Sequence, residues 1–208
     1  MSKNLLLIFT RNPELGKVKT RLAAGIGDEA ALEIYKFLVS HTQNITRNLS
    51  CTKYVYYSQC IHENDNWDRN SYTKKLQHGT DLGARMKNAF HEGFQDGFEN
   101  IIIIGSDMLD ITQRDIKLAF DTLRDNDYVI GPASDGGYYL LGMNKLNPGL
   151  FNEKAWGTST VLSDTLKDLQ GNKVIKLEEK NDVDRLEDIL GIDEFEHLIN
   201  NSNQANGL

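Results

Sequence analysis

The stretch Ile101-Ile102-Ile103-Ile104-Gly105-Ser106-Asp107 decides the fold class of this sequence. Four β-branched residues in a row favour a strand, and Gly105 ends it. A second run, Leu5–Phe9, is apolar at every position, which is typical of a parallel strand buried on both faces. Polar residues come directly after each of the two runs. Sheets of this kind bind ligands at the carboxyl ends of their strands. The residues just after these strands are therefore the first candidates for a functional site.

Apolar runs and stretches of helical periodicity alternate along the rest of the chain. Further strands are expected at 54–57, 127–130, 138–143 and 174–177, and helices at 28–49, 82–94, 112–123, 161–169 and from 184 onward. The expected helix caps are Asp28, Thr112 with Asp115, and Asp184 with Glu187. The pattern predicts an α/β fold, a three-layer α/β/α sandwich with a mostly parallel sheet. Residues 1–199 are predicted to form one domain and 200–208 a frayed, disordered tail.

Composition and charge exclude several classes of protein. The 208 residues are 39% apolar and 25% charged, as in ordinary globular proteins. With 23 Lys and Arg against 30 Asp and Glu, the net charge of −7 argues against a nucleic-acid binder. No apolar run approaches the ~20 residues that span a bilayer. Cys51 and Cys60 lack metal or redox spacing and are expected to be free thiols. A cytoplasmic protein is predicted, with its oligomeric state left open.

The loop after the first strand carries an island of positive charge. Residues 1–21 hold five basic side chains against Glu14 alone, a local charge of 5 − 1 = +4 in an acidic protein; the five are Lys3, Arg11, Lys17, Lys19 and Arg21. Such an island at a strand end suits an anion, phosphate above all. The loop is not a Walker A motif, because the required glycine and Ser/Thr positions are absent. The alternative is a basic loop that is merely solvated.

Carboxylates form the second group of candidates. Asp107 follows the strand of isoleucines and could hold Mg²⁺, although an aspartate there could also cap a turn. Asp182 and Asp184 precede the last helix, and helix capping explains Asp184 but not Asp182. A carboxylate ~4 Å from a phosphate oxygen costs roughly 4 kcal/mol at an effective dielectric near 20. If these residues meet a polyphosphate, a divalent cation must lie between them.

Three further segments could contact a substrate. Asp81-Leu82-Gly83-Ala84-Arg85 could contact a base or ribose, or could be a plain helix start. Asp135-Gly136-Gly137-Tyr138 has paired glycines that let a backbone approach a ligand, and would also suit a hairpin turn. Asp135 is the candidate general base. Trp156, beside Gly157, could line a pocket.

Together these segments resemble the selenodomain-associated, glycosyltransferase-like transferases of the nucleotide-diphospho-sugar transferase superfamily. The resemblance rests on five motifs in order: Pro13-x-x-Gly16-x-x-Lys19-Thr20-Arg21-Leu22, Asp81-Leu82-Gly83-x-Arg85-Met86, Gly105-Ser106-Asp107, Gly131-Pro132-Ala133-x-Asp135-Gly136-Gly137-Tyr138, and Asp182-Val183-Asp184 with Glu187-Asp188. Two departures stand out. Met108-Leu109 replaces the x-Pro that usually follows the first aspartate, and Arg185-Leu186 replaces the usual Thr-Pro after the second.

The resemblance implies a glycosyltransferase-A-like fold and a set of roles. The nucleotide would be bound by Arg11, Gly16, Lys19, Arg21, Asp81, Gly83 and Arg85. The metal, Mg²⁺ or Mn²⁺, would be held by Asp107, Asp182 and Asp184, and the sugar or acceptor by Gly136, Gly137, Tyr138 and Trp156. Asp107, Lys19, Arg21 and Asp135 would be catalytic.

Two classes of function follow from these roles. The first is a metal-dependent transferase that takes an NTP or an NDP-sugar and a small-molecule acceptor. Its reaction would be nucleotidyl transfer to a phosphorylated acceptor or glycosyl transfer. The alternative is a non-catalytic module that binds nucleotides or sugar phosphates.

Overall fold

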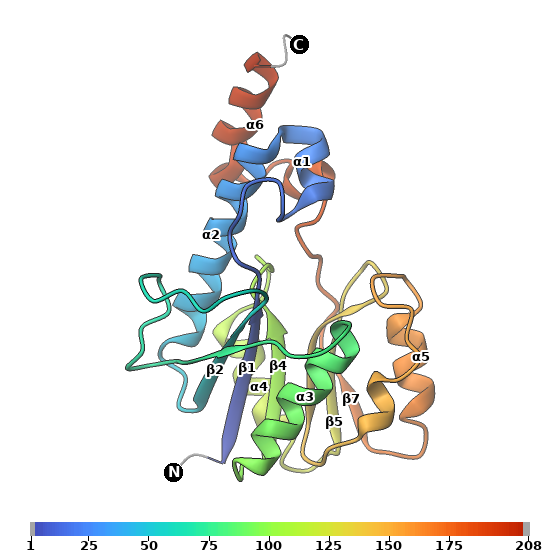
Figure 1. Ribbon diagram of the computed structural model, residues 1–208. Helices are drawn as coiled ribbons and strands as arrows, with labels where there is room; N and C mark the ends of the chain where they lie inside the picture. The colour runs from blue at the N-terminus through green and yellow to red at the C-terminus, as the bar shows by residue number, and fades with distance from the viewer. Residues whose placement is uncertain (1–2, 206–208) are drawn as a thin grey trace.

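The computed structural model describes residues 3–205, and a mixed sheet forms its centre (Figure 1). Over these residues the sheet has seven strands in the order β3-β2-β1-β4-β6-β5-β7. The strands are β1 (Asn4–Thr10), β2 (Thr52–Tyr57), β3 (Thr73–Leu76), β4 (Asn100–Gly105), β5 (Tyr128–Pro132), β6 (Tyr138–Met143) and β7 (Val174–Lys176). In the described sheet only β6 runs antiparallel to its neighbours. The predicted α/β class and mostly parallel sheet are confirmed.

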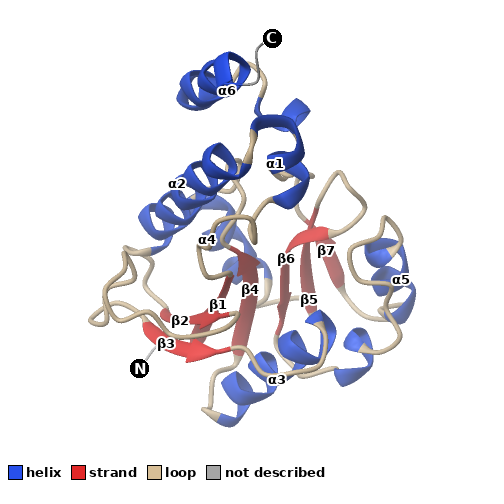
Figure 2. Ribbon diagram, turned by 45° about the horizontal axis from the view of Figure 1, so that its top comes forward, coloured by secondary structure: helices blue, strands red, loops and turns tan. Residues whose placement is uncertain are grey.

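Helices cover both faces of the sheet, which gives the three layers seen in Figure 2. On one face α2 (Asp28–Thr46) and α4 (Gln113–Thr122) pack on Ile102 and Ile104. On the other face α3 (Leu82–Gln95) and α5 (Val161–Asp168) pack on Ile101 and Ile103. Because successive side chains of a strand point to opposite faces, the four isoleucines serve both cores. The burial expected of the central strands is therefore observed.

A third apolar cluster lies beyond the sheet and joins helices from both ends of the chain. It contains α1 (Thr20–Ile26), the first half of α2, the 3₁₀ turn η2 (Leu186–Ile189) and α6 (Asp193–Ala205). Leu22, Ile34 and Phe195 are buried in it. In Figure 1 this helical cap stands over the end of the sheet toward which β1 and β4 point. The segment after β1 is therefore held between the sheet and the cap.

The described residues contain one helix and one strand that the sequence pattern did not predict. The helix is α1, at residues 20–26, where no helix was predicted. Strand β3 has the sequence Thr-Lys-Lys-Leu, too polar for a buried strand, because it lies at the edge of the sheet, where lysines are tolerated. Another short 3₁₀ turn, η1 (Pro148–Phe151), precedes α5.

Helix caps agree with expectation in part. Thr112 and Asp115 form the expected capping box. Asp28 does not cap α2, which begins after Gly27 and has Asp28 in its first turn. The Asp184–Glu187 cap is also wrong, because η2 is capped by Arg185 and Asp188, and Asp188 accepts hydrogen bonds from the backbone N–H groups of 184 and 185. The tail 200–208 stays a prediction: α6 enters it, and 206–208 lie outside the described residues.

Candidate functional site

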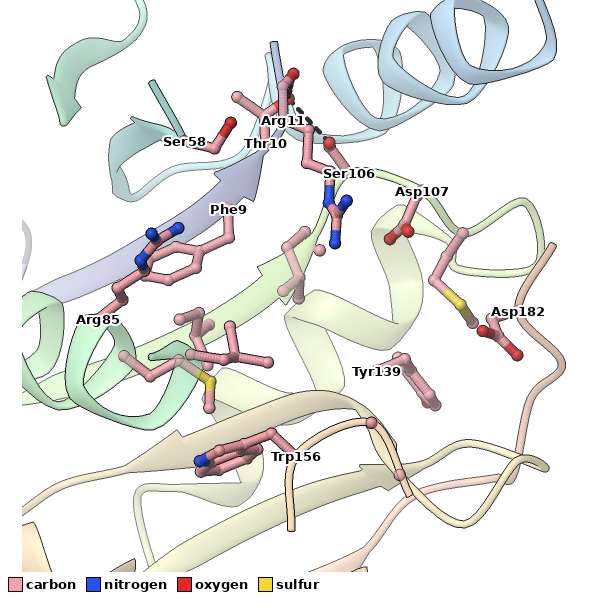
Figure 3. Close-up of a pocket in the computed structure, with 18 of the residues that line it drawn as sticks. Phe9, Thr10, Arg11, Ser58, Arg85, Ser106, Asp107, Tyr139, Trp156 and Asp182 are labelled. Carbon is pink, nitrogen blue, oxygen red and sulfur yellow. Dashed lines mark hydrogen bonds between the residues drawn. The ribbon is translucent and has the colours of Figure 1, made fainter. Parts of the chain in front are cut away.

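A cavity of about 650 Å³ opens at the carboxyl ends of β1 and β4. Its walls come from the loops after β1 and β4, the start of α3, the β5–β6 hairpin and the segments around 157 and 182. Figure 3 shows Asp107 and Asp182 on one side of this cavity and Arg85 with Phe9 on the other. Trp156 lies along a third side. Segments far apart in the sequence thus converge where a doubly wound sheet places its ligands.

Lys19 and Asp107 form an ion pair at this cavity. The Lys19 Nζ donates to Asp107 Oδ2 at 2.8 Å, and the Lys19 side chain is only 5% exposed. The Asp107 side chain stays 47% exposed and lines the cavity. Burial by itself raises the pKa of Asp107, but the Lys19 charge and hydrogen bond, helped by Arg11, outweigh burial and hold that pKa below its usual range. Asp107 is therefore ionised at neutral pH.

The other basic side chains of the first loop are arranged differently. Arg11 lines the cavity, where its charge acts on Asp107. Arg21 lies away from the cavity wall, and its Nη1 donates to Asp184 Oδ2 at 2.9 Å. Gly16, with φ of +70°, turns the loop and does not line the cavity. The loop thus pairs two of its cations with the very aspartates that were predicted to be metal ligands.

Tyr35 of α2 connects the loops after β1 and β4. Its hydroxyl oxygen accepts the backbone N–H of Arg11 at 2.8 Å and lies 3.2 Å from Thr10 Oγ1 and 3.4 Å from Ser106 Oγ. Ser106 Oγ in turn donates to Thr10 Oγ1 at 2.9 Å (Figure 3). Burial raises the pKa of Tyr35, so the hydroxyl stays protonated. Tyr35 was not among the predicted site residues, because nothing in the local sequence marks the hydroxyl of a core tyrosine as functional.

Replacing Tyr35 with Phe should lower the free energy of unfolding by about 1–3 kcal/mol, since the buried partners lose their hydrogen bonds. It should also weaken ligand binding in the cavity, because Arg11 and Ser106 lose a shared anchor. Denaturant unfolding and calorimetric titration with nucleotide measure the two effects. Tyr72→Phe is the matched control: it removes a buried hydroxyl bonded to Thr46, away from the cavity, and should affect stability alone. Equal ligand affinity in both variants would contradict the role given to Tyr35.

Asp182 faces the same cavity from the segment before η2. Burial raises the pKa of Asp182, and the Asp135 carboxylate raises it further, whereas Lys19 acts in the opposite direction. The Asp182 carboxyl group therefore lies near other carboxylates, and the positive charge of Lys19 offsets only part of their repulsion. A divalent cation bound in the cavity would reduce this repulsion between carboxylates.

The raised pKa of Asp182 has a consequence for stability. For an acid whose pKa is higher in the folded state, the contribution to stability is fully present below the unfolded pKa and is lost as pH rises through the folded value. Asp182→Asn should therefore raise the melting temperature at neutral pH. The gain should vanish at about pH 3, below the ordinary aspartate pKa of about 3.9. Thermal unfolding at both pH values checks this, and a melting temperature that falls at neutral pH would exclude it.

The segment at the start of α3 combines structural and cavity-lining residues. Asp81 Oδ1 accepts the backbone N–H of Ala84 at 2.8 Å and so caps the helix. Arg85 lines the cavity, and its Nη1 donates to Gln77 Oε1 at 3.3 Å. Gly83 is buried, and a Cβ there would lie 2.6 Å from Trp156 Nε1. Gly83 thus lets α3 pack closely on Trp156, and the nucleotide roles of Asp81 and Gly83 stay predictions.

The β5–β6 hairpin supplies the opposite wall. Asp135 Oδ1 accepts the backbone N–H of Gly137 at 2.8 Å, which fixes the turn, and Asp135, Gly137 and Tyr138 line the cavity. Gly136 does not line it: its φ is +89°, and a Cβ there would meet Ser159 O at 2.3 Å. The Tyr138 hydroxyl is buried and has no hydrogen-bond partner among residues 3–205. The hairpin and the 156–159 segment are therefore packed as one wall.

The predicted site residues fall into two groups. Arg11, Arg85, Asp107, Asp135, Gly137, Tyr138, Trp156 and Asp182 line the cavity. Lys19, Arg21 and Asp184 lie behind it as ion-pair partners, while Gly16, Asp81, Gly83 and Gly136 shape its walls. Sequence reasoning missed Tyr35 and Gln77. Gln77 Nε2 donates to Thr10 O at 3.2 Å, and this residue was missed because it follows the unpredicted strand β3.

The cavity offers carboxylate oxygens to the predicted Mg²⁺ or Mn²⁺. Within residues 3–205, no three His, Cys, Asp or Glu side chains are grouped closely enough to hold a metal ion by themselves. Mg²⁺ commonly uses only one or two carboxylates and completes its shell with water and substrate phosphates. Asp107, ionised and half-exposed, and Asp182, short of counter-charge, are oxygen donors of this kind. These residues fit a metal that arrives with a phosphate ligand.

The fold is that of the nucleotide-diphospho-sugar transferase and cytidylyltransferase structures, an α/β fold with a mostly parallel sheet. The chain is similar to a Desulfovibrio desulfuricans G20 protein whose assignment as a nucleotide-diphospho-sugar transferase is provisional. The two share 29% identity with a TM-score of 0.85, over 99% of this chain and 96% of that one. The chain belongs to the family DUF2064, described as "Uncharacterized protein conserved in bacteria", whose model matches residues 41–158.

More distant structures share the fold alone. CMP:2-keto-3-deoxy-manno-octonic acid synthetase complexed with CTP matches with a TM-score of 0.53 at 11% identity, over 100% of both chains. Rv0371c of Mycobacterium tuberculosis H37Rv, in complex with manganese, matches with a TM-score of 0.53 at 11% identity, over 89% of this chain and 95% of that one. No curated protein matched. Between residues 3 and 205, no helix is long and apolar enough to cross a membrane.

Proposed function

We propose that this protein is a Mg²⁺- or Mn²⁺-dependent transferase that acts on a nucleotide-activated substrate. The observation that carries the proposal is the Lys19–Asp107 pair at the carboxyl ends of β1 and β4, beside Arg11 and Asp182. It puts cations for a polyphosphate and carboxylates for a divalent ion in one cavity. The proposal includes membership of the glycosyltransferase-like group and the role given below to each site residue.

The residues of this chain would divide the work as follows. Arg11 and Lys19 bind the phosphates and stabilise the negative charge that develops on them during transfer. Asp107 and Asp182 would hold the metal, which when bound neutralises phosphate charge and polarises the phosphoryl or diphosphate group. Arg85 and Trp156 offer a cation and an aromatic face to the nucleotide or the transferred group. Asp135, with one oxygen engaged in the turn, is the proposed proton acceptor.

Two donors are compatible with this arrangement. With an NTP, an oxygen of a phosphorylated acceptor attacks the α-phosphorus, the bond to the bridging oxygen breaks, and pyrophosphate leaves. With an NDP-sugar, the acceptor attacks the anomeric carbon and the nucleoside diphosphate leaves. The distant structural relatives that include a CTP complex support the first reaction, and the relative at 29% identity supports the second.

The experiment combines binding with product analysis. The protein is titrated with NTPs and NDP-sugars, with and without Mg²⁺ or Mn²⁺, by thermal shift. A ligand at ~100 times its Kd should stabilise by about 2.7 kcal/mol. Any stabilising ligand is then incubated with phosphorylated and sugar acceptors, and pyrophosphate or nucleoside diphosphate is assayed. Metal-dependent binding followed by either product supports the proposal; binding without product supports the non-catalytic module instead, and no binding rejects both.

A further inference from the structure

The backbone at Lys19 is unusual. Its φ of 47° and ψ of 44° are left-handed, and Glu153 is the only other residue besides glycine with positive φ in the described chain. Lys19 is the N-cap of α1 yet makes no side-chain capping bond. Strained residues of this kind persist where the surrounding structure fixes them, often at functional sites. The conformation turns a long cation inward, where its side chain is 5% exposed.

The inward ammonium occupies a position between acids. Lys19 Nζ bonds one oxygen of Asp107 at 2.8 Å, and its charge also acts on Asp182. Asp135, Asp182 and Asp184 all approach this side of the site, and among them Asp184 has its own partner in Arg21 at 2.9 Å. The Lys19 ammonium is therefore the counter-charge of the two carboxylates proposed as metal ligands.

From this arrangement we infer that Lys19 is an exchangeable stand-in for the divalent cation. It gives up its bond to Asp107 when metal enters and then turns to the incoming phosphates. This inference rests on the proposed function. Each charge keeps a partner in the exchange. The divalent cation replaces the Lys19 ammonium beside the carboxylates, and the released ammonium pairs with the polyphosphate. A fixed phosphate-binding lysine would instead keep its bond to Asp107, and metal would not change the accessibility of its ammonium.

The exchange makes the two ligands interdependent. Metal alone must break the Lys19–Asp107 bond and leave a side chain with 5% exposure without its anion, so metal alone binds weakly. A polyphosphate alone must compete with Asp107 for the same ammonium. When both are present, each cost is offset, and by linkage the two ligands strengthen each other's binding by the same factor.

The first test measures Mn²⁺ binding by electron paramagnetic resonance in the absence of nucleotide. Lys19→Met removes the competing charge and should bind Mn²⁺ more tightly than the wild type, by about tenfold or more. The same variant should bind Mn²⁺–pyrophosphate more weakly, because the phosphate partner is lost. Lys167→Met is the control: Lys167 is 68% exposed, pairs with Asp164 and does not line the cavity, so both affinities should be unchanged.

The second test uses the wild-type chain and so does not depend on how the variant folds. Lysine acetylation followed by mass spectrometry compares the reactivity of Lys19 with that of Lys167, which is exposed and does not line the cavity. Mn²⁺ alone should increase the labelling of Lys19 relative to Lys167, because the displaced ammonium becomes accessible. Unchanged labelling at saturating Mn²⁺ would overturn the exchange.

The outcomes separate this inference from the proposed function. If wild type and Lys19→Met bind Mn²⁺ equally and labelling is constant, the exchange is wrong while the metal site stands. If neither protein binds Mn²⁺ even in the presence of pyrophosphate, the metal-dependent function and the exchange both fail. Tighter Mn²⁺ binding and weaker Mn²⁺–pyrophosphate binding by Lys19→Met, together with increased labelling of Lys19 in the wild type, support the exchange; a fixed Lys19 would not produce the labelling change.

Discussion

Asp107→Asn should abolish the metal-dependent stabilisation by nucleotide and lower turnover by about 10²–10³-fold, the loss typical when one electrostatic group of a transition-state site is removed. Asparagine keeps the shape of the side chain but neither holds a divalent cation well nor neutralises Lys19. The free energy of unfolding should also fall, by about 1–2 kcal/mol, since Lys19 is buried while Asp107 is half-exposed. Thermal unfolding with and without nucleotide and metal measures both effects.

Asp110→Asn is the control for that experiment. Asp110 lies three residues further along, is exposed and does not line the cavity. The Asp110→Asn variant loses one negative charge from the same loop. An effect of net charge alone would therefore appear in both variants. Metal-dependent nucleotide binding that survives in Asp107→Asn would remove Asp107 from the proposed metal site.

Gly136→Ala should be strongly destabilising, at about 2–5 kcal/mol. A left-handed φ costs an L-residue about 1–2 kcal/mol, and forcing a methyl group into packed atoms adds about 1–3 kcal/mol. Here φ is +89°, and the new Cβ would meet the backbone oxygen of Ser159 at 2.3 Å. Because that backbone cannot rotate away as a side chain could, the 156–159 wall must shift, and ligand binding should weaken too.

Gly171→Ala separates backbone strain from collision. Its φ of +86° is nearly the same, but nothing lies within 4 Å of the added Cβ. It should therefore cost only the left-handed strain, about 1–2 kcal/mol, with ligand binding intact. Denaturant unfolding of the two variants side by side gives the contribution of the contact with Ser159 as their difference, and equal losses would disprove it.

Much of the fold could be predicted from the sequence because its signals are local. The isoleucine run at 101–104 fixes a buried strand, and the Thr112–Asp115 pair fixes a helix start, whatever surrounds them. Two elements gave weaker signals. Strand β3 is polar because the charges of Lys74 and Lys75 are paired with Asp65 and Glu92. Helix α1 is stabilised by packing against α2, α6 and η2, not by its own sequence pattern. Local periodicity carries no information about such partners.

The sequence by itself determined which chemical groups this protein would bring to the ends of its strands: a basic loop after β1, an aspartate after β4 and a glycine-rich hairpin. Only the tertiary structure decided how these groups pair. Lys19 binds Asp107 across 88 residues of sequence, and Arg21 binds Asp184 across 163. Such pairings depend on strand order and on a helical cap built from both ends of the chain. Counting charged residues along the sequence gives the net charge of a loop. Which charges pair depends on the distances between them in the folded chain, because the Coulomb energy falls with distance.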